Sequence, residues 1–130
     1  MLRDFIQRRS RREPLQHITG TTSFCGHEIA VNRHVLVPRP ETELLAELGW
    51  QFLNQLSEGS AAQGPGQKEG DRRSSPLRGL DFCAGSGCIA IALAAKCPEA
   101  TIVATDISAE ALALAGENAK QNNVVERIEL

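Results

Sequence analysis

Two glycines, an alanine and an aspartate in the second half of the chain have the types and spacing of a nucleoside-binding site. Gly85, Gly87 and Ala90 fit the pattern G-x-G-x-x-G/A within the stretch LDFCAGSGCIAIALA, 80–94. The pattern follows a predicted strand and opens a predicted helix, where glycines let a backbone approach a ligand and free N–H groups face an anion. Asp106 ends the next predicted strand, where a carboxylate can accept both hydroxyls of a ribose. The spacing therefore predicts a site for an adenosine-containing cofactor.

Asp81, four residues before Gly85, bears on which adenosine cofactor the site would take. The stretch DFCAGSG matches the D/E-x-x-x-G-x-G opening of class I methyltransferases, whereas dinucleotide sites seldom place a charge there. In the methyltransferase interpretation, the helix N-terminus faces the amino-acid part of S-adenosylmethionine, including its carboxylate. Two alternatives stay open here: an NAD(P)-binding domain, and a strand–helix turn that binds no ligand.

The second half of the chain alternates predicted strands and helices around this motif. We expect strands at GLDFCA, ATIVATD and RIEL, and helices at SGCIAIALAAKC and SAEALALAGENAKQNN, with Ser108 as N-cap and Asn122 or Asn123 at the C-terminal end. The first helix is apolar on most sides and should be buried against a sheet. A β-α-β-α-β order predicts an α/β fold with a parallel sheet. Because such sheets normally have more than three strands, we expect the chain to be part of a larger protein or a truncated one.

The first half of the chain predicts the elements that precede this sheet. Residues 1–13 form a short basic helix closed by Pro14, and residues 21–38 form a small β-hairpin with turn residues at Gly26 and Asn32. An amphipathic helix follows, with an apolar face of Leu44, Leu45, Leu48, Phe52 and Leu56. The expected domain boundaries are 1–56 for these elements, 57–78 for a flexible insertion rich in glycine, serine and charge, and 79–130 for the first half of a cofactor-binding domain.

Composition and charge limit the function classes further. The chain is 42% hydrophobic, a composition that predicts a globular protein. Its formal net charge of −2 predicts no general attraction to nucleic acid. Four arginines (Arg8, Arg9, Arg11 and Arg12) gather near the N-terminus. They form either a solvated helix end or a contact to RNA or an acidic partner. The sequence has no apolar signal region and no run long enough to span a membrane, so we expect a cytoplasmic protein.

The cysteines and histidines do not predict a metal site. Cys25, Cys83, Cys88 and Cys97 form no C-x-x-C pair, and no histidine follows them at zinc spacing. Free buried thiols in a reducing compartment are the interpretation that fits best, with a disulfide or metal site as the alternative. We expect His17, His27 and His34 to be structural or exposed, because they form no recognisable pattern.

Three longer stretches together resemble one family. EPLQHITGTTSFCGHEIAVNRHVLVPRPETELL, LDFCAGSGCIAIALA and ATDISAEALALAGENA are similar to the HemK/PrmC family of peptide chain release factor N5-glutamine methyltransferases. The combination of VPRPETE with a downstream methyltransferase glycine loop carries the resemblance, which covers nearly everything except 57–78. The resemblance implies a partial class I (Rossmann-like) methyltransferase fold. It also implies methyl transfer from S-adenosylmethionine to the glutamine of the GGQ motif in release factors.

The resemblance also implies roles for individual residues. The cofactor would lie against Asp81, Cys83, Ala84, Gly85, Ser86, Gly87 and Asp106, and the methionine end or the substrate pocket would be formed by Arg39, Pro40, Thr42 and Glu43. Alternatives with no ligand stay open for three residues of the second group. Arg39 could form a surface ion pair, Thr42 could be a first-turn hydroxyl, and Glu43 could be a carboxylate that complements the helix dipole.

The sequence departs from the family in two places. The family often has G-T-G-S-G where this chain has CAGSG, so Cys83 replaces the first glycine and Ala84 the threonine. This thiol is compatible with cofactor binding provided that residue 83 keeps a negative φ. The family's Asn-Pro-Pro-Tyr motif, which holds the glutamine amide, does not occur in these 130 residues. We therefore assign no catalytic residue and expect the 130 residues alone to be inactive.

Two functions from other classes remain as alternatives at this point. One is a different S-adenosylmethionine-dependent methyltransferase, such as an adenine-N6 nucleic-acid methylase, against which the VPRPETE segment argues. The other is a non-catalytic module that binds a release factor or the ribosome through the arginine-rich end.

Overall fold

The structure is a computed structural model that describes residues 1–61 and 76–130. Two short helices and a hairpin come first, followed by a long helix and then by alternating strands and helices. The elements in chain order are α1 (Leu2–Ser10), α2 (Leu15–Thr19), β1 (Thr21–Phe24), β2 (His27–Ala30), α3 (Pro40–Ala61), β3 (Leu77–Phe82), α4 (Cys88–Lys96), β4 (Ala100–Thr105), α5 (Ala109–Gln121), the 3-10 helix η1 (Val125–Arg127) and β5 (Ile128–Glu129).

The strands β3, β4 and β5 form a parallel sheet in that order, which confirms the predicted β-α-β-α-β arrangement. Asp81 is level with Ala104, and Phe82 is level with Thr105, in the register of β3 and β4. Because the two strands end side by side, the residues after Phe82 meet those after Thr105 at one edge of the sheet. This register brings the glycine loop next to Asp106.

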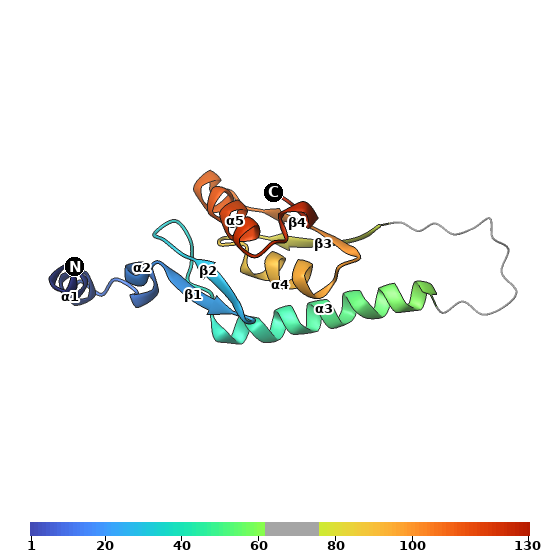
Figure 1. Ribbon diagram of the computed structural model, residues 1–130, viewed down its shortest axis with the longest axis horizontal. Coiled ribbons are helices and arrows are strands. Elements are labelled where there is room, and N and C mark those ends of the chain that lie inside the picture. The colour runs from blue at the N-terminus through green and yellow to red at the C-terminus, as the bar shows by residue number, and fades with distance from the viewer. Residues whose placement is uncertain (62–75) are drawn as a thin grey trace, which may run out of the picture.

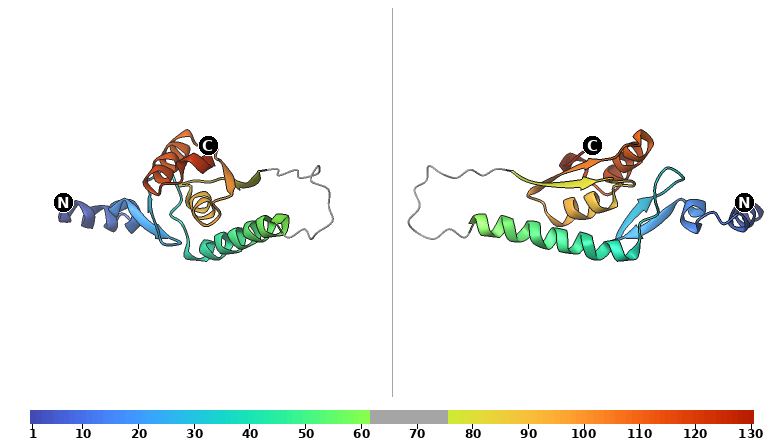
Figure 2. Two further views of the ribbon diagram at one scale, coloured as in Figure 1. Left: turned by 45° about the vertical axis from the view of Figure 1, so that its right-hand side comes forward. Right: turned by 180° about the vertical axis from the view of Figure 1, so that it is seen from behind.

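The helices α3 and α4 lie on one face of the sheet. In Figures 1 and 2, α4 lies between the sheet and α3. Asp81, Ile102 and Ala104 on this face are buried, and so is most of α4, as its apolar sequence predicts. On the opposite face the side chains of Leu80 and Phe82 are 66% and 77% exposed, so no described element covers them.

The N-terminal segment is more structured than the sequence predicts. The helix α2, which the sequence analysis did not anticipate, follows Pro14, and its Gly20 C-cap adopts a φ of +87°. Arg8 forms a hydrogen-bonded ion pair with Glu13 across the corner between α1 and α2, so that arginine has a structural role. The predicted hairpin is confirmed but is shorter, with its turn at residues 25–26 and with no strand in the rest of the predicted range, 31–38.

The long helix α3 confirms a predicted helix but corrects which of its faces is buried. The predicted apolar face is exposed at Leu44, Leu45, Leu48, Phe52 and Leu56. The helix instead packs through Ala46, Leu53 and the backbone of Gly49, where an added Cβ would lie 3.0 Å from a methyl group of Leu93 on α4. The small residues Ala46 and Gly49 occupy the buried face because they let the axes of α3 and α4 approach closely.

The boundaries of α3 and β3 bear on the predicted insertion, 57–78. The helix continues to Ala61 and the strand begins at Leu77, so both ends of that range lie in regular structure. The rest of the predicted insertion, 62–75, lies outside the described residues.

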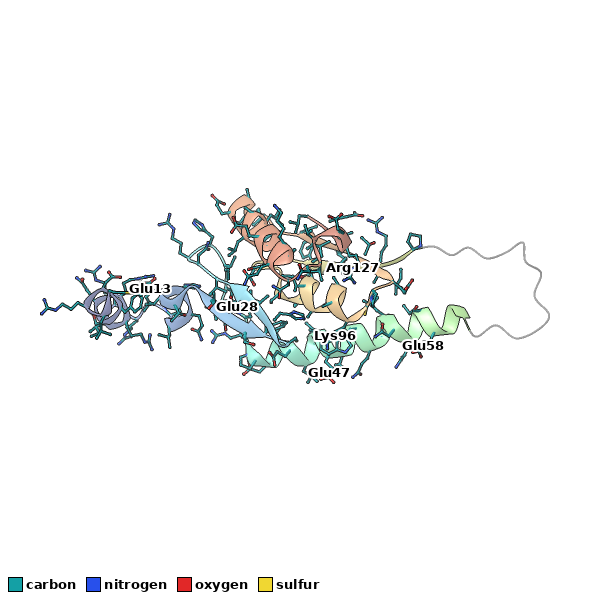
Figure 3. The ribbon with its side chains drawn as sticks, viewed as in Figure 1. Glu13, Glu28, Glu47, Glu58, Lys96 and Arg127 are labelled. Atoms are coloured by element: carbon teal, nitrogen blue, oxygen red, sulfur yellow. The ribbon has the colours of Figure 1, made fainter. Side chains whose placement is uncertain are left out.

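Two long cationic side chains make contacts at the C-terminal end of α4 (Figure 3). The ammonium group of Lys96 lies 5.7 Å from the centre of the Trp50 ring on α3, which is a cation–π contact. Arg127 donates hydrogen bonds to the carbonyl oxygens of Ala94 and Cys97, which are acceptors at the C-terminal end of the helix.

Among the described residues, no helix has the length and apolar character needed to cross a bilayer.

Replacing Leu53 and Phe52 in turn tests which face of α3 is buried. Leu53 is 7% exposed and Phe52 is 61% exposed. We expect Leu53→Ala to lower the free energy of unfolding by about 2–4 kcal/mol, because it leaves a cavity in the core. Phe52→Ala should change it by less than about 1 kcal/mol. Urea denaturation of the two variants measures the difference, and a larger loss for Phe52→Ala would show that the sequence-predicted face is the buried one.

Candidate functional site

The glycine loop, residues 83–87, turns the chain from the end of β3 into α4. Cys83, Gly85 and Gly87 have positive φ values of +63°, +55° and +78°. The N–H of Ala84 donates to the carbonyl oxygen of Thr105 at 2.8 Å, and the N–H of Gly87 donates to that of Ala84 at 2.8 Å. The loop is therefore a defined turn that is joined to the end of β4.

The conformation of Cys83 contradicts the sequence-based expectation of a negative φ at this position. Its left-handed backbone is one that glycine adopts freely and that a side chain penalises by roughly 1 kcal/mol. The thiol is exposed, which also corrects the expectation that it would be buried. Cys88 and Cys97 are buried free thiols as predicted, and Cys25 is half-buried. Burial raises the pKa of Cys88 to about 11, so that thiol stays protonated at neutral pH.

The two glycines of the loop are required for different reasons. At Gly87 an added Cβ would lie 2.9 Å from the Cβ of Ala115, so the absence of a side chain lets α5 pack against the loop. At Gly85 an added Cβ would meet no heavy atom within 4 Å. The protein therefore leaves open space over Gly85, at the point where the predicted cofactor would approach the backbone.

Asp106 holds the loop from the adjacent strand. Its Oδ2 accepts the N–H of Gly85 at 2.8 Å, and its Oδ1 accepts the N–H of Ser108 at 3.0 Å. These two hydrogen bonds lower the pKa of the carboxyl group and keep it ionised at neutral pH, and the bond from Ser108 has the larger effect. Each carboxylate oxygen has a further lone pair, so the group retains the capacity to accept two hydroxyls.

Asp81 supports the loop from beneath. Its Oδ2 accepts the N–H of Ala90 at 3.1 Å and so satisfies one of the free donors in the first turn of α4. Burial raises the pKa of this carboxyl group, against the lowering effect of the Ala90 hydrogen bond, and the charge of Asp106 raises it further. Two carboxyl groups beside one turn thus have their pKa values shifted in opposite directions.

Exposure divides the predicted cofactor residues into two groups. Cys83, Gly85 and Asp106 are at least partly accessible. Asp81, Ala84, Ser86 and Gly87 are buried, and support the loop from inside. The first group is the one that a ligand could contact through side chains or exposed backbone.

The second predicted group, at the start of α3, is attached to the hairpin. Glu43 accepts the N–H of Cys25, at the hairpin turn, with a distance of 2.8 Å. The N–H of Thr42 donates to the carbonyl oxygen of Arg39 at 3.0 Å, while Arg39 and Pro40 are exposed. Within the described ranges, no recorded hydrogen bond or ion pair joins these four residues to the glycine loop. Their predicted role at the methionine end or the substrate pocket stays a prediction.

The sequence analysis missed one residue at the site, Asn118 on α5. This side chain is fully buried and makes three hydrogen bonds. Its Oδ1 accepts the N–H of Ala30 at 2.8 Å, and its Nδ2 donates to the carbonyl oxygens of Ala30 at 3.0 Å and Ser86 at 2.9 Å. The available signal was an amide on the apolar stripe of a helix, in line with Ala111 and Leu114.

Comparison with known proteins identifies a family that fits this geometry. The family model described as "Methyltransferase small domain" matches residues 72–129. A release factor glutamine methyltransferase of Chlorobaculum tepidum is 42% identical over 120 residues, which are 92% of this chain and 36% of the relative. That of Nitratidesulfovibrio vulgaris is 38% identical over 125 residues, 96% of this chain and 36% of the relative.

Two further matches are to methyltransferases of other descriptions. A "Bifunctional methyltransferase" of Rickettsia bellii is 36% identical over 133 residues, 96% of this chain and 24% of the relative. A solved O-methyltransferase family 2 protein from Planctomyces limnophilus, in complex with apigenin, covers 89% of this chain and 45% of that one, at 23% identity and a TM-score of 0.41. The chain spans between 24% and 36% of the first curated relatives it matches. The chain is thus similar to the methyltransferase small domain over residues 72–129, and to release factor glutamine methyltransferases over most of its length.

Proposed function

We propose that the glycine loop and Asp106 bind S-adenosylmethionine, and that the whole protein, though not these 130 residues alone, methylates the glutamine side chain of the GGQ motif in peptide chain release factors. The observation that carries the proposal is the bond between the Asp106 carboxylate and the N–H of Gly85, beside open space. The relatives named as release factor glutamine methyltransferases support the substrate class. A cytoplasmic location, where release factors act, belongs to the same proposal.

The residues present fit this cofactor. The open space over Gly85 admits a ligand against the backbone, and the ionised Asp106 has lone pairs for the two ribose hydroxyls. The N-terminus of α4, beside the loop, offers a favourable position for the cofactor's carboxylate. When bound, S-adenosylmethionine supplies an electrophilic methyl group on a sulfonium.

The chemistry of the acceptor explains what the rest of the protein must add. An amide nitrogen is a poor nucleophile, because its lone pair is delocalised into the carbonyl group. Catalysis therefore depends on holding the amide in line with the methyl group and on accepting hydrogen bonds from its N–H groups. We propose that the segment Arg39–Glu43 borders this pocket, since Glu43 attaches it to the hairpin that Asn118 joins to the glycine loop.

Replacing Asp106 tests the proposed ribose contact. We expect Asp106→Ala to weaken binding of S-adenosylhomocysteine by about one to two decades for each ribose hydrogen bond lost, because hydrogen bonds to a charged group are worth roughly 1.5–3 kcal/mol. Ser108→Ala is the matched control, since it removes the N-cap bond to Ala111 but leaves Asp106 in place. Calorimetric titration measures both variants. A change of less than twofold for a folded Asp106→Ala would rule out the ribose contact.

Replacing each glycine of the loop separates ligand contact from folding. In both alanine variants the new residue must keep the left-handed backbone of the glycine that it replaces, which lowers the free energy of unfolding by roughly 1 kcal/mol. Gly87→Ala adds a clash with Ala115 and should lower the free energy of unfolding by about 2–4 kcal/mol. Gly85→Ala should lower it by only about 1 kcal/mol but weaken S-adenosylhomocysteine at least tenfold, because its methyl group enters the open space. Unchanged affinity in Gly85→Ala would mean that the ligand does not approach this face.

A further inference from the structure

Asn118 joins the glycine loop to the hairpin, two segments that are far apart in the sequence. Its Nδ2 donates one hydrogen bond to Ser86 in the loop and one to Ala30, the last residue of β2. Its Oδ1 takes the N–H of Ala30 as well, so the amide pairs with that residue in the manner of a neighbouring strand. Both donors and one acceptor site of a fully buried amide are therefore used.

The position of Ser86 gives this hydrogen bond its effect on the loop. Ser86 lies between Gly85 and Gly87, whose backbones can adopt more conformations than those of other residues. The N–H groups of Gly85 and Ala84 donate to Asp106 and Thr105, and these hydrogen bonds hold that part of the loop. The Asn118 bond is the contact from α5 that fixes the peptide between the two glycines, and therefore the direction of the loop as it enters α4.

The hairpin side of the same amide leads toward the second part of the proposed site. β2 ends at Ala30, and the chain then continues to the Arg39–Glu43 segment. Glu43 in turn holds the hairpin turn at Cys25. One side chain thus relates the loop proposed to bind the cofactor to the segment proposed to border the substrate.

We propose that Asn118 is a positioning residue, which sets the conformation of the glycine loop and its placement relative to the Arg39–Glu43 segment. Asn118 itself is fully buried, so its role would be indirect, through the loop that it positions. The inference rests on the proposed function for its effect on cofactor affinity, but its effect on the loop can be measured without any ligand.

Asn122, one turn further along the chain, offers a matched control. Its Nδ2 donates to the carbonyl oxygen of Glu28 on β2 at 2.9 Å and to that of Asn118 at 2.9 Å, so it also attaches α5 to the hairpin. It makes no recorded bond to residues 83–87, all of which are described. Removing either amide loosens the hairpin, but only Asn118 reaches the loop.

The experiment compares Asn118→Ala with Asn122→Ala in the full chain. Without ligand, we expect the N–H groups of Gly85 and Gly87 to exchange with solvent at least tenfold faster in Asn118→Ala than in Asn122→Ala, as followed by NMR. With ligand, Asn118→Ala should bind S-adenosylhomocysteine about 3- to 10-fold more weakly than the unmodified chain, the value of one lost neutral hydrogen bond, and Asn122→Ala within twofold of it.

The outcomes separate this inference from the proposed function. If the unmodified chain does not bind S-adenosylhomocysteine, the proposed cofactor site fails, while the exchange rates still test the positioning role. Equal effects of the two variants on loop exchange would overturn that role and leave Asn118 as an ordinary packing residue. If Asn118→Ala does not fold, Asn118→Asp takes its place, since it keeps the shape and the acceptor for Ala30 but has at most one proton to donate.

Discussion

The turn between β3 and α4 depends on two carboxylates that accept its backbone N–H groups. A strand that runs directly into a helix leaves donors without partners at the first turn of the helix. Asp81 accepts one of them from Ala90, and Asp106 accepts the N–H of Gly85 inside the loop. Because β3 and β4 end in register, the second carboxylate reaches the loop without any rearrangement of the sheet. The loop can therefore be rigid and still present a nearly bare backbone to a ligand.

The same arrangement explains why the two carboxyl groups differ. Asp81 is buried, which raises its pKa, and it supports the first turn of α4 by accepting the N–H of Ala90. Asp106 is half-accessible, and its pKa is lowered by the hydrogen bonds from Ser108 and Gly85, which keeps it ionised. Only the second group combines negative charge, free lone pairs and access to ligand. The structure thus separates a buried carboxyl group that supports the loop from a partly accessible one, to which we assign the proposed ribose contact.

The local parts of this account could be predicted from the sequence, because they depend on short spacings. The strand–glycine–helix order, the N-cap at Ser108 and the position of Asp106 all follow from neighbouring residues, and the structure confirms the elements. The prediction of which face of α3 is buried was wrong. A periodic pattern of apolar residues cannot show that Ala46 and Gly49 let α3 approach α4 more closely than the leucines would. The partners of Asn118, up to 88 residues away along the chain, could not be predicted without the fold.

Calorimetric titration of the unmodified chain with S-adenosylhomocysteine, with NADH as the control, tests the central claim most directly. The claim is that the loop and Asp106 form a methyl-donor site rather than a dinucleotide site. We predict saturable binding of S-adenosylhomocysteine with one ligand per chain, and no binding of NADH. Binding of NADH, or of neither ligand by a chain that unfolds cooperatively, would contradict it.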